Sequence, residues 1–265
     1  MELRIMEDSA ELAREAAEFF VWLGKEAIRT GGRFCVVLSG GSTPRALHAI
    51  LAGPDCSEQL DWRQVWFFFG DERGVPPDHP ESNFAMAEET LFRPLKIAPG
   101  QIARMKAERA DLDEAARAYE AAVRTHFGVH PPACPRFDLI LLGLGADGHT
   151  ASLFPDTAAL EERTRLVVPT QSPKGIKNRL TLTASAINQA KTVVFLASGA
   201  GKAEAVSAVI EGRTRPDRPD RLGQEDRRFP ARLIHPVNGR LIWFVDRAAA
   251  ARLTVAQQGI VSHEE

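Results

Sequence analysis

The chain has 265 residues, of which 44% are hydrophobic and 26% charged, and its formal net charge is −2. These values are ordinary for a globular protein, and without a basic excess they argue against nucleic acid as a partner. Because the first residues lack the apolar core of a signal peptide and no apolar run approaches the ~20 residues that span a bilayer, we expect a cytoplasmic protein that does not bind membranes.

The N-terminal half is predicted to alternate between helices and buried strands. Continuous apolar runs at residues 34–39 and 65–69 have the length of strands that are buried on both faces. Between and around these runs, apolar residues recur at helical spacing behind serine or acidic residues that suit helix starts. The predicted helices cover residues 9–29, residues 45–51 after Pro44, a segment capped by Ser82, and residues 111–127.

The C-terminal half continues this alternation. Further strands are predicted at residues 137–142, 179–183, 192–197 and 241–245, and further helices after residue 200 and in the Ala-rich segment behind the last strand. Residues 211–230 mix Arg, Asp and Pro, which is typical of a solvated surface loop. Apolar strands separated by helices indicate an α/β fold with a mostly parallel sheet and helices on both faces. We expect residues 1–265 to form a single domain.

The first stretch that could carry chemistry is SGGSTPR, residues 39–45, between a predicted strand and a predicted helix. Two glycines, two hydroxyl residues and a proline at a helix start are typical of a phosphate cradle, in which backbone N–H groups and the helix dipole face an anion. A tight turn capped by Ser42 or Thr43 explains the same pattern, and both interpretations stay open. The candidate anion-binding residues are Gly40, Gly41, Ser42 and Thr43.

The second stretch is GDER, residues 70–73, directly after a buried aromatic strand. Charged groups enclosed at a strand end are costly unless they are paired. Asp71 and Arg73 are therefore either members of a structural ion-pair cluster, or an acid–base group and an oxyanion stabiliser at the edge of the sheet.

The third stretch, residues 143–149, carries three glycines around an Asp-Gly-His triplet. Its G-x-G-x-x-G spacing suggests a dinucleotide site. However, Asp147 would place negative charge where a pyrophosphate sits, and Pro155 comes too early for the helix of that fingerprint. A carboxylate two residues from an imidazole, at the carboxyl end of a strand, is typical of an orienting group and a general base. Asp147 and His149 are therefore the catalytic candidates.

Two further basic residues follow or open later strands. Arg179 opens RLTLT, and Lys202 lies in SGAGK at a predicted helix start, where it could meet an anion. Taken alone, each is explained as a surface charge. No two histidines have metal-ligand spacing, and the three cysteines include no C-x-x-C pair, so we expect reduced thiols and no metal.

Together these stretches closely resemble the 6-phosphogluconolactonases of the glucosamine-6-phosphate isomerase/6-phosphogluconolactonase superfamily. The resemblance covers nearly the whole chain in the order VVLSGGSTPRALHAIL, WFFFGDERGVPPDHPESNFAMAEETLF, FDLILLGLGADGHTASLFP, RLTLT, SGAGK and PARLIHPVNGRLIWFVD. It implies a modified Rossmann-like sheet, no cofactor, and hydrolysis of 6-phospho-D-glucono-1,5-lactone to 6-phospho-D-gluconate in the oxidative pentose phosphate pathway. The expected partner is this small sugar-phosphate lactone, and the expected state is a monomer or a small homo-oligomer.

The resemblance also assigns roles to residues. The catalytic histidine falls on His149, with Asp147 orienting its ring, so that the imidazole activates a water without a metal. Arg73 is expected to face the oxyanion, and the role of Asp71 is left open, with holding Arg73 as one interpretation. The phosphate-binding residues are Gly40, Gly41, Ser42, Thr43, Arg179 and Lys202.

One position separates two branches of this superfamily. The related sugar-phosphate deaminases resemble D-G-H-x-A-x-x-E-P in the third stretch, whereas this chain has Phe154 in place of the glutamate. A phenyl ring cannot relay a proton, which favours the lactonase. The alternatives are a glucosamine-6-phosphate deaminase or isomerase, and a non-catalytic sugar-phosphate sensor. Asp147, His149 and Arg73 argue against the sensor, because a binder needs no base.

Overall fold

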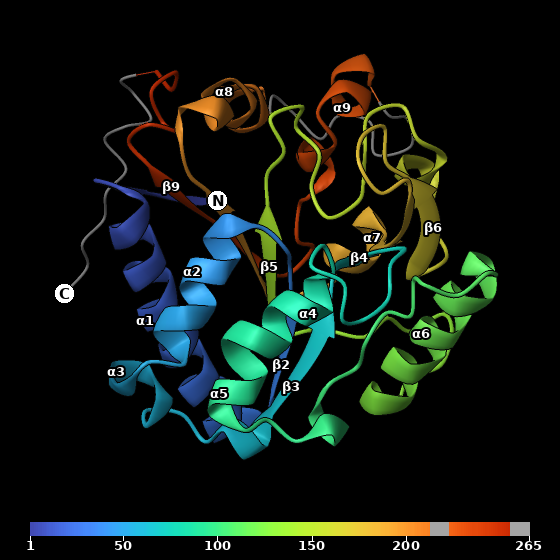
Figure 1. The fold of residues 1–265 in the computed structure, drawn as a ribbon. Coiled ribbons are helices and arrows are strands. Elements are labelled where there is room, and N and C mark those ends of the chain that lie inside the picture. Colours follow the sequence, from blue (N-terminus) through green and yellow to red (C-terminus); the bar gives the residue numbers. More distant parts are fainter. Residues whose placement is uncertain (213–222, 255–265) are drawn as a thin grey trace.

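The computed structural model describes residues 1–212 and 223–254, which form two β-sheets flanked by helices (Figure 1). The larger sheet is parallel, with the strand order β1-β9-β8-β5-β2-β3. The smaller sheet is antiparallel, with the order β4-β7-β6. The strands are β1 (Glu2–Met6), β2 (Phe34–Leu38), β3 (Val65–Phe69), β4 (Asp71–Arg73), β5 (Leu139–Gly143), β6 (Val167–Gln171), β7 (Asn178–Leu182), β8 (Thr192–Ala197) and β9 (Arg240–Asp246).

The helices connect these strands. They are α1 (Ser9–Gly31), α2 (Ser42–Leu51), α3 (Pro54–Ser57), α4 (Asn83–Ala87), α5 (Arg93–Leu95), α6 (Leu112–Phe127), α7 (Ala184–Ile187), α8 (Ala203–Glu211) and α9 (Gln224–Arg228). A π-helical turn, η2 (Glu88–Phe92), joins α4 to α5. Among the residues described, no helix combines the length and the apolarity needed to cross a membrane.

Side chains that alternate along β3 show that both faces of the larger sheet are covered. The Phe67 ring packs against Phe92 of η2 with centroids 5.0 Å apart, and the neighbouring Phe68 ring packs against His126 of α6 at 5.1 Å. Successive side chains of a strand point to opposite faces, so η2 and α6 lie on opposite faces. The predicted fold class, a mostly parallel α/β sheet with helices on both faces, is confirmed.

Several element boundaries differ from the prediction. The helix after β2 begins at Ser42 rather than behind Pro44, because proline at an early helical position has no N–H to lose. The Ala-rich segment behind β9 forms turns over residues 247–252 instead of the predicted helix. Within the predicted loop 211–230, residues 224–228 form the short helix α9, and residues 213–222 lie outside the described part of the chain.

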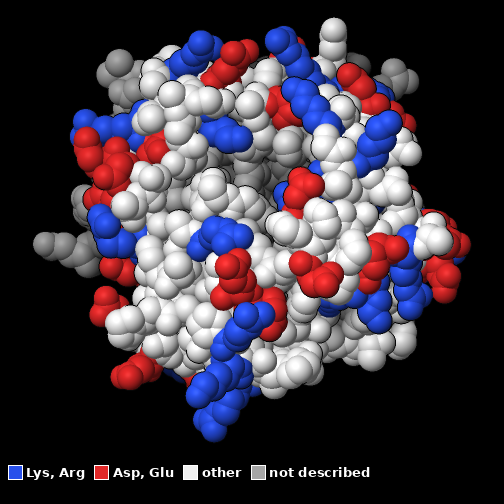
Figure 2. Space-filling view, viewed as in Figure 1, with Lys and Arg blue, Asp and Glu red and all other residues white. Residues whose placement is uncertain are grey.

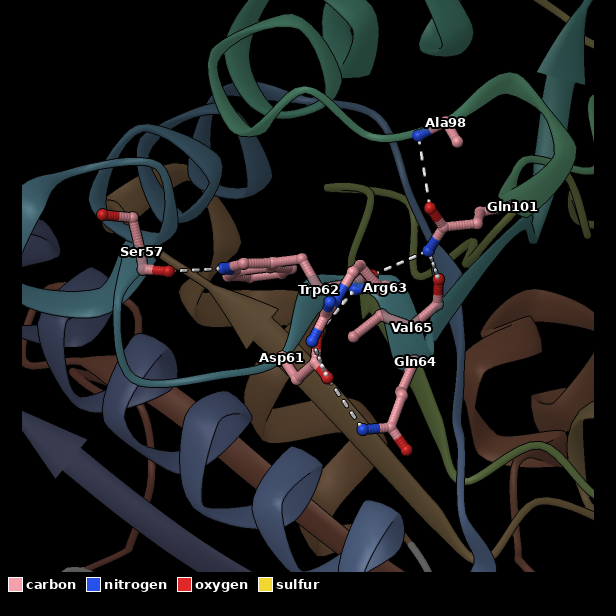
Figure 3. Close-up of polar contacts among 8 residues, drawn as sticks. All are labelled: Ser57, Asp61, Trp62, Arg63, Gln64, Val65, Ala98 and Gln101. Carbon is pink, nitrogen blue, oxygen red and sulfur yellow. Dashed lines mark hydrogen bonds and ion pairs between the residues drawn. The ribbon is translucent and has the colours of Figure 1, made fainter.

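Backbone carbonyl groups at the amino end of β3 are fixed by one side chain (Figure 3). The Gln101 amide nitrogen donates to the carbonyl oxygens of Trp62 and Val65 at 2.7 Å each, and its oxygen accepts the Ala98 N–H at 3.2 Å. These bonds tie the turn before β3 and the first residue of the strand to the segment that begins at Ala98, and the Trp62 carbonyl also accepts the Val65 N–H. They lie at the end of β3 that is farther from GDER, so they support the sheet rather than the candidate site.

The strand order places a crevice beside β2. Since β2 lies between β3 and β5, the chain leaves β2 towards one neighbour and later returns on its other side. Open parallel sheets bind ligands at such a switch point, beyond the carboxyl ends of the strands. The SGGST and LGADGH stretches start at those ends, and a Cβ atom on Gly143 would lie 4.0 Å from the Gly40 carbonyl oxygen. In Figure 1 this is the end towards which the β5 arrow points.

Candidate active site

The SGGST turn leads from β2 directly into α2. Gly41 is the N-cap residue and has a φ of 116°, a backbone conformation that favours glycine. No side chain caps the helix there, so the N–H groups of Ser42 and Thr43 have no intrahelical acceptor. The interpretation in which Ser42 or Thr43 caps the helix is therefore wrong, because both lie inside α2. The uncapped N–H groups and the helix dipole leave an end that suits an anion.

The loop after β5 folds back so that His149 lies over Gly145. The His149 carbonyl accepts the Gly145 N–H at 2.8 Å, and the Thr150 hydroxyl donates to the Gly143 carbonyl at 2.8 Å. A Cβ atom at position 145 would overlap the His149 ring and the Asp147 carboxylate. The turn therefore requires a glycine at this position for the histidine and the aspartate to meet above it.

Asp147 and His149 form a hydrogen-bonded pair. Oδ1 of Asp147 lies 2.5 Å from Nδ1 of His149 and also accepts the His149 backbone N–H at 3.2 Å. Since an ionised carboxylate only accepts hydrogen bonds, Nδ1 carries the proton of the neutral ring and Nε2 keeps its lone pair. Partial burial raises the pKa of Asp147, but the hydrogen bond and charge of His149 outweigh this effect and lower that pKa to about 2.

Two phenyl rings pack against the histidine loop. The Phe154 ring lies 4.7 Å from the His149 ring, centroid to centroid, and is buried. Phe229, directly behind α9, packs against Gly148, whose carbonyl accepts the Ala231 N–H at 2.9 Å. The imidazole therefore packs against the apolar ring of Phe154. The turn that carries the imidazole is fixed by its contacts with Phe229 and Ala231.

Arg73 and Arg179 lie opposite each other in the β4–β7 ladder, a register that brings Cα atoms to about 5 Å. Like charges directly opposite destabilise a strand pair. Backbone carbonyls hold the two side chains, since Arg73 donates to Glu81 at 2.6 Å and Arg179 donates to Ile176 at 2.8 Å. Burial lowers the pKa of Arg179, and the charge of Asp71 opposes that effect. This pairing of cations suits a shared anionic ligand.

Asp71 has different partners from those considered in the sequence. Its Oδ1 accepts the Asn83 amide at 2.9 Å, and its Oδ2 accepts the Ser152 hydroxyl at 2.6 Å. The ion pairs found in residues 1–212 and 223–254 include none between Arg73 and either Asp71 or Glu72. The interpretations of GDER as an ion-pair cluster and of Asp71 as the holder of Arg73 are therefore wrong, because Asp71 bonds to two other stretches of the chain.

Three buried residues of this network were not predicted, namely Glu72, Asn83 and Ser152. Glu72 accepts the backbone N–H groups of Asn83 at 2.8 Å and Phe84 at 2.9 Å, and thus holds the start of α4. Burial raises the pKa of Glu72, and these hydrogen bonds oppose that effect. In the sequence, Ser82 and Asn83 indicate only the start of a helix. No local pattern identifies Ser152 as a hydrogen-bond partner of Asp71.

Lys202 completes the set of expected residues. It ends the 3-10 turn η5 (Ala200–Lys202) behind β8, and β8 is the neighbour of β5. The cradle, the histidine loop and Lys202 therefore follow the adjacent strands β2, β5 and β8, while the arginine pair belongs to the small sheet. Figure 2 shows this face of the molecule hollowed near its centre, over the region where Figure 1 places the end of β5.

A pocket of ≈ 480 Å³ lies between the histidine loop and α9, and Asp147, Asp156, Glu204 and Arg228 line it. Within the described part of the chain, no group of three or more His, Cys, Asp and Glu side chains is arranged to hold a metal ion. At the carboxyl ends of the strands the motifs supply an imidazole–carboxylate pair, cations and an uncapped helix start, which suit acid–base chemistry on a small anion.

Comparisons with known proteins agree with these motifs. A family model described as glucosamine-6-phosphate isomerases/6-phosphogluconolactonase matches residues 7–243. Probable 6-phosphogluconolactonase 1 of Arabidopsis thaliana is 37% identical over 259 residues, which cover 95% of this chain and 93% of that protein. The 6-phosphogluconolactonase of Synechocystis sp. is 40% identical over 228 residues, which cover 86% of this chain and 88% of that protein.

Solved structures give the same result for the fold. The 6-phosphogluconolactonase from Trypanosoma cruzi is 31% identical, with a TM-score of 0.78 and coverage of 96% of this chain and 97% of that one. A monomeric glucosamine-6-phosphate deaminase is 24% identical, with a TM-score of 0.75 over 95% of this chain and 100% of that one. Both proteins share the fold, so the fold alone does not distinguish hydrolysis from deamination.

Proposed function

Because the chain belongs to the glucosamine-6-phosphate isomerase/6-phosphogluconolactonase family, we infer that it is an enzyme that hydrolyses 6-phospho-D-glucono-1,5-lactone to 6-phospho-D-gluconate in the oxidative pentose phosphate pathway. The observation that carries this inference is the Asp147–His149 pair, which stands at a strand end beside an uncapped helix start. We further propose that the enzyme is cytoplasmic, and a monomer or a small homo-oligomer.

His149 is the general base of the proposed reaction. Its Nε2 takes a proton from a water molecule as the water oxygen attacks the lactone carbonyl carbon. Asp147 holds the ring in the required tautomer and stabilises the imidazolium that forms, as in a catalytic triad. The imidazolium then returns the proton to the ring oxygen as the carbon–oxygen bond breaks, which gives the open-chain acid.

The cations hold the charges of the substrate. Arg73 stabilises the oxyanion, and a donor in this role contributes about 3 kcal/mol to catalysis. Arg179 and Lys202, together with the cradle formed by Gly40, Gly41, Ser42 and Thr43, bind the phosphate. Phosphate binding keeps the carbonyl in register with the base, because binding energy from a remote group serves orientation.

The deaminase alternative loses support from the surroundings of His149. Ring opening of an amino sugar needs a further proton-relaying group, whereas the neighbour of the imidazole here is the phenyl ring of Phe154. The sensor alternative does not explain why a base and its orienting carboxylate are assembled beside the cradle. Lactone hydrolysis requires both, and it requires no carboxylate at position 154.

The function is tested by measuring lactone hydrolysis, corrected for the spontaneous reaction, with the wild-type chain and with His149→Ala. We expect the variant to lose about 10²-fold or more in kcat and to keep its affinity for 6-phosphogluconate. His130→Ala, at an exposed position in the loop behind α6, serves as the control and should keep full activity. Release of ammonia from glucosamine 6-phosphate would instead identify a deaminase, and an inactive wild-type chain would support the sensor.

A further inference from the structure

Ser152 joins the histidine loop to the small sheet. It lies three residues behind His149 and is fully buried, and its hydroxyl donates to Oδ2 of Asp71 at 2.6 Å. Its backbone N–H donates to the Thr181 hydroxyl at 3.2 Å. Asp71 and Thr181 are themselves opposite each other in the β4–β7 ladder. One residue of the histidine loop therefore bonds to both of these strands.

The same strands carry the two arginines. Arg73 lies two residues behind Asp71 on β4, and Arg179 lies two residues before Thr181 on β7. Residues two apart in a strand point to the same face of a sheet. The face that Ser152 contacts is therefore also the face that presents both guanidinium groups.

The other oxygen of Asp71 extends this connection to the cradle. Oδ1 accepts the amide of the buried Asn83, which also donates to the Asp71 carbonyl at 2.9 Å. A Cβ atom on Gly40 would overlap that amide, so Asn83 lies directly against the cradle. Each carboxylate oxygen of Asp71 is thus bonded to a donor from another motif, which suits a structural junction better than a base that acts on substrate.

We propose that Ser152 is a positioning residue for lactone hydrolysis, which through Asp71 sets the spacing between His149 and the pair Arg73 and Arg179. This inference rests on the proposed function, because the spacing matters only to a substrate that reaches the imidazole and the arginines at once. A displacement of reacting groups by about 1 Å costs about 10²-fold in rate. Removal of the Ser152 hydroxyl deletes the bond to Asp71 and leaves the backbone bond to Thr181 in place.

The test compares Ser152→Ala with Thr183→Ala. Thr183 is also fully buried, and its hydroxyl donates to the Arg165 carbonyl at 2.9 Å, accepts the Ala186 N–H at 3.2 Å and lies 3.0 Å from the Ser185 hydroxyl. It bonds to neither Asp71 nor the histidine loop. Both variants lose a buried hydroxyl, and the Thr183 hydroxyl has more hydrogen-bond partners than the Ser152 hydroxyl, which bonds to Asp71. A larger loss of turnover in Ser152→Ala therefore reports on positioning rather than on the loss of buried hydrogen bonds.

For Ser152→Ala we expect kcat on 6-phosphogluconolactone to fall about 10- to 100-fold. The inhibition constant of inorganic phosphate should change by less than about twofold, because Arg179, which binds the phosphate, keeps its own carbonyl contact. Thr183→Ala should keep its kcat. A kcat that is unchanged in Ser152→Ala, or that falls equally in Thr183→Ala, would overturn the positioning role.

Asp71→Asn is the second variant, which preserves size and keeps the test decisive if Ser152→Ala does not fold. It should lower kcat with the phosphate inhibition constant kept, and adding Ser152→Ala to it should cost little more, because both changes break one connection. Full activity of Asp71→Asn, or additive losses, would contradict the proposal while wild-type hydrolysis stands. Absence of hydrolysis by the wild-type chain would refute the proposed function itself.

Discussion

Replacing Asp147 with Asn removes the charge beside His149 and leaves the shape of the loop in place. The amide has the size of the carboxylate, so it fits over Gly145 where no larger group would. Its oxygen can still accept the Nδ1 proton that the Asp147 carboxylate accepts at 2.5 Å. The variant therefore separates the contribution of the negative charge from that of ring orientation.

The structure sets the size of the effect. When His149 takes a proton, a cation forms beside the carboxylate, and two unit charges about 4 Å apart attract by about 4 kcal/mol at an effective dielectric constant of about 20. Solvent weakens this attraction, because 31% of the His149 side chain and 46% of the Asp147 side chain are exposed. If solvent halves the attraction to about 2 kcal/mol, kcat should fall about 30-fold in Asp147→Asn.

The carboxylate of Asp147 is charged over the whole pH range of the assay. Burial raises the pKa of Asp147, but hydrogen bonding to His149 outweighs this effect and lowers that pKa to about 2, so this negative charge is lost only as the pH falls towards 2. The wild-type enzyme and the variant therefore differ by one charge at every pH measured.

The assay is lactone hydrolysis from about pH 5 to 8, with the spontaneous rate subtracted at each pH. Asp156→Asn is the matched control, because Asp156 lines the cavity beside Asp147 and has a φ of 57°, which asparagine tolerates. The control should keep its kcat. An Asp147→Asn enzyme with wild-type turnover would refute the reasoning from charge.

Two other substitutions test the histidine loop at Gly145 and the support of β3 by Gln101. Gly145→Ala should lower kcat about 10²-fold, because its Cβ atom displaces the His149 ring, whereas Gly100→Ala, with no atom within 4 Å of its Cβ position, should keep its activity. Gln101→Ala should lower the free energy of unfolding in urea by about 2 kcal/mol without changing kcat, because the bonds from the Gln101 amide to the carbonyls of Trp62 and Val65 are lost together with the bond from the Ala98 N–H. Gln64→Ala removes one hydrogen bond to Asp61 and should cost about 0.5 kcal/mol; equal losses in the two glutamine variants would contradict this account.

The apolar runs predicted the central strands because a strand of a parallel sheet is buried on both faces. Residues 65–69 and 192–197 were predicted with the bounds that the structure gives to β3 and β8. The search for apolar runs did not find β4 and β6 of the small sheet, because β4 consists of charged residues and β6 contains Pro169. RLTLT alternates between apolar and polar residues as a half-buried strand does, but Leu180, Thr181 and Leu182 of β7 are all buried.

The sequence predicted that SGGST, GDER and the histidine loop follow strands. The first and the third of these stretches lie close together because β2 and β5 are neighbours in the sheet. The sequence could not predict how side chains from different stretches pair. Asp71 and Ser152 are 81 positions apart, and their hydrogen bond depends on how the small sheet packs against the histidine loop. Local patterns carry no information on such a pairing, because a buried serine and a solvent-exposed one look alike in sequence.

The choice between hydrolysis and deamination rests on side chains, since the two kinds of enzyme share this fold. Two positions could supply a proton-transfer group in addition to His149, and neither does. Position 154 holds a phenylalanine packed on the imidazole, and both oxygens of Asp71 are bonded to donors within the protein. Nε2 of His149 keeps its lone pair, because Nδ1 is the ring nitrogen that Asp147 holds. One base suffices to activate a water and to protonate the departing ring oxygen, so the arrangement matches hydrolysis of a lactone.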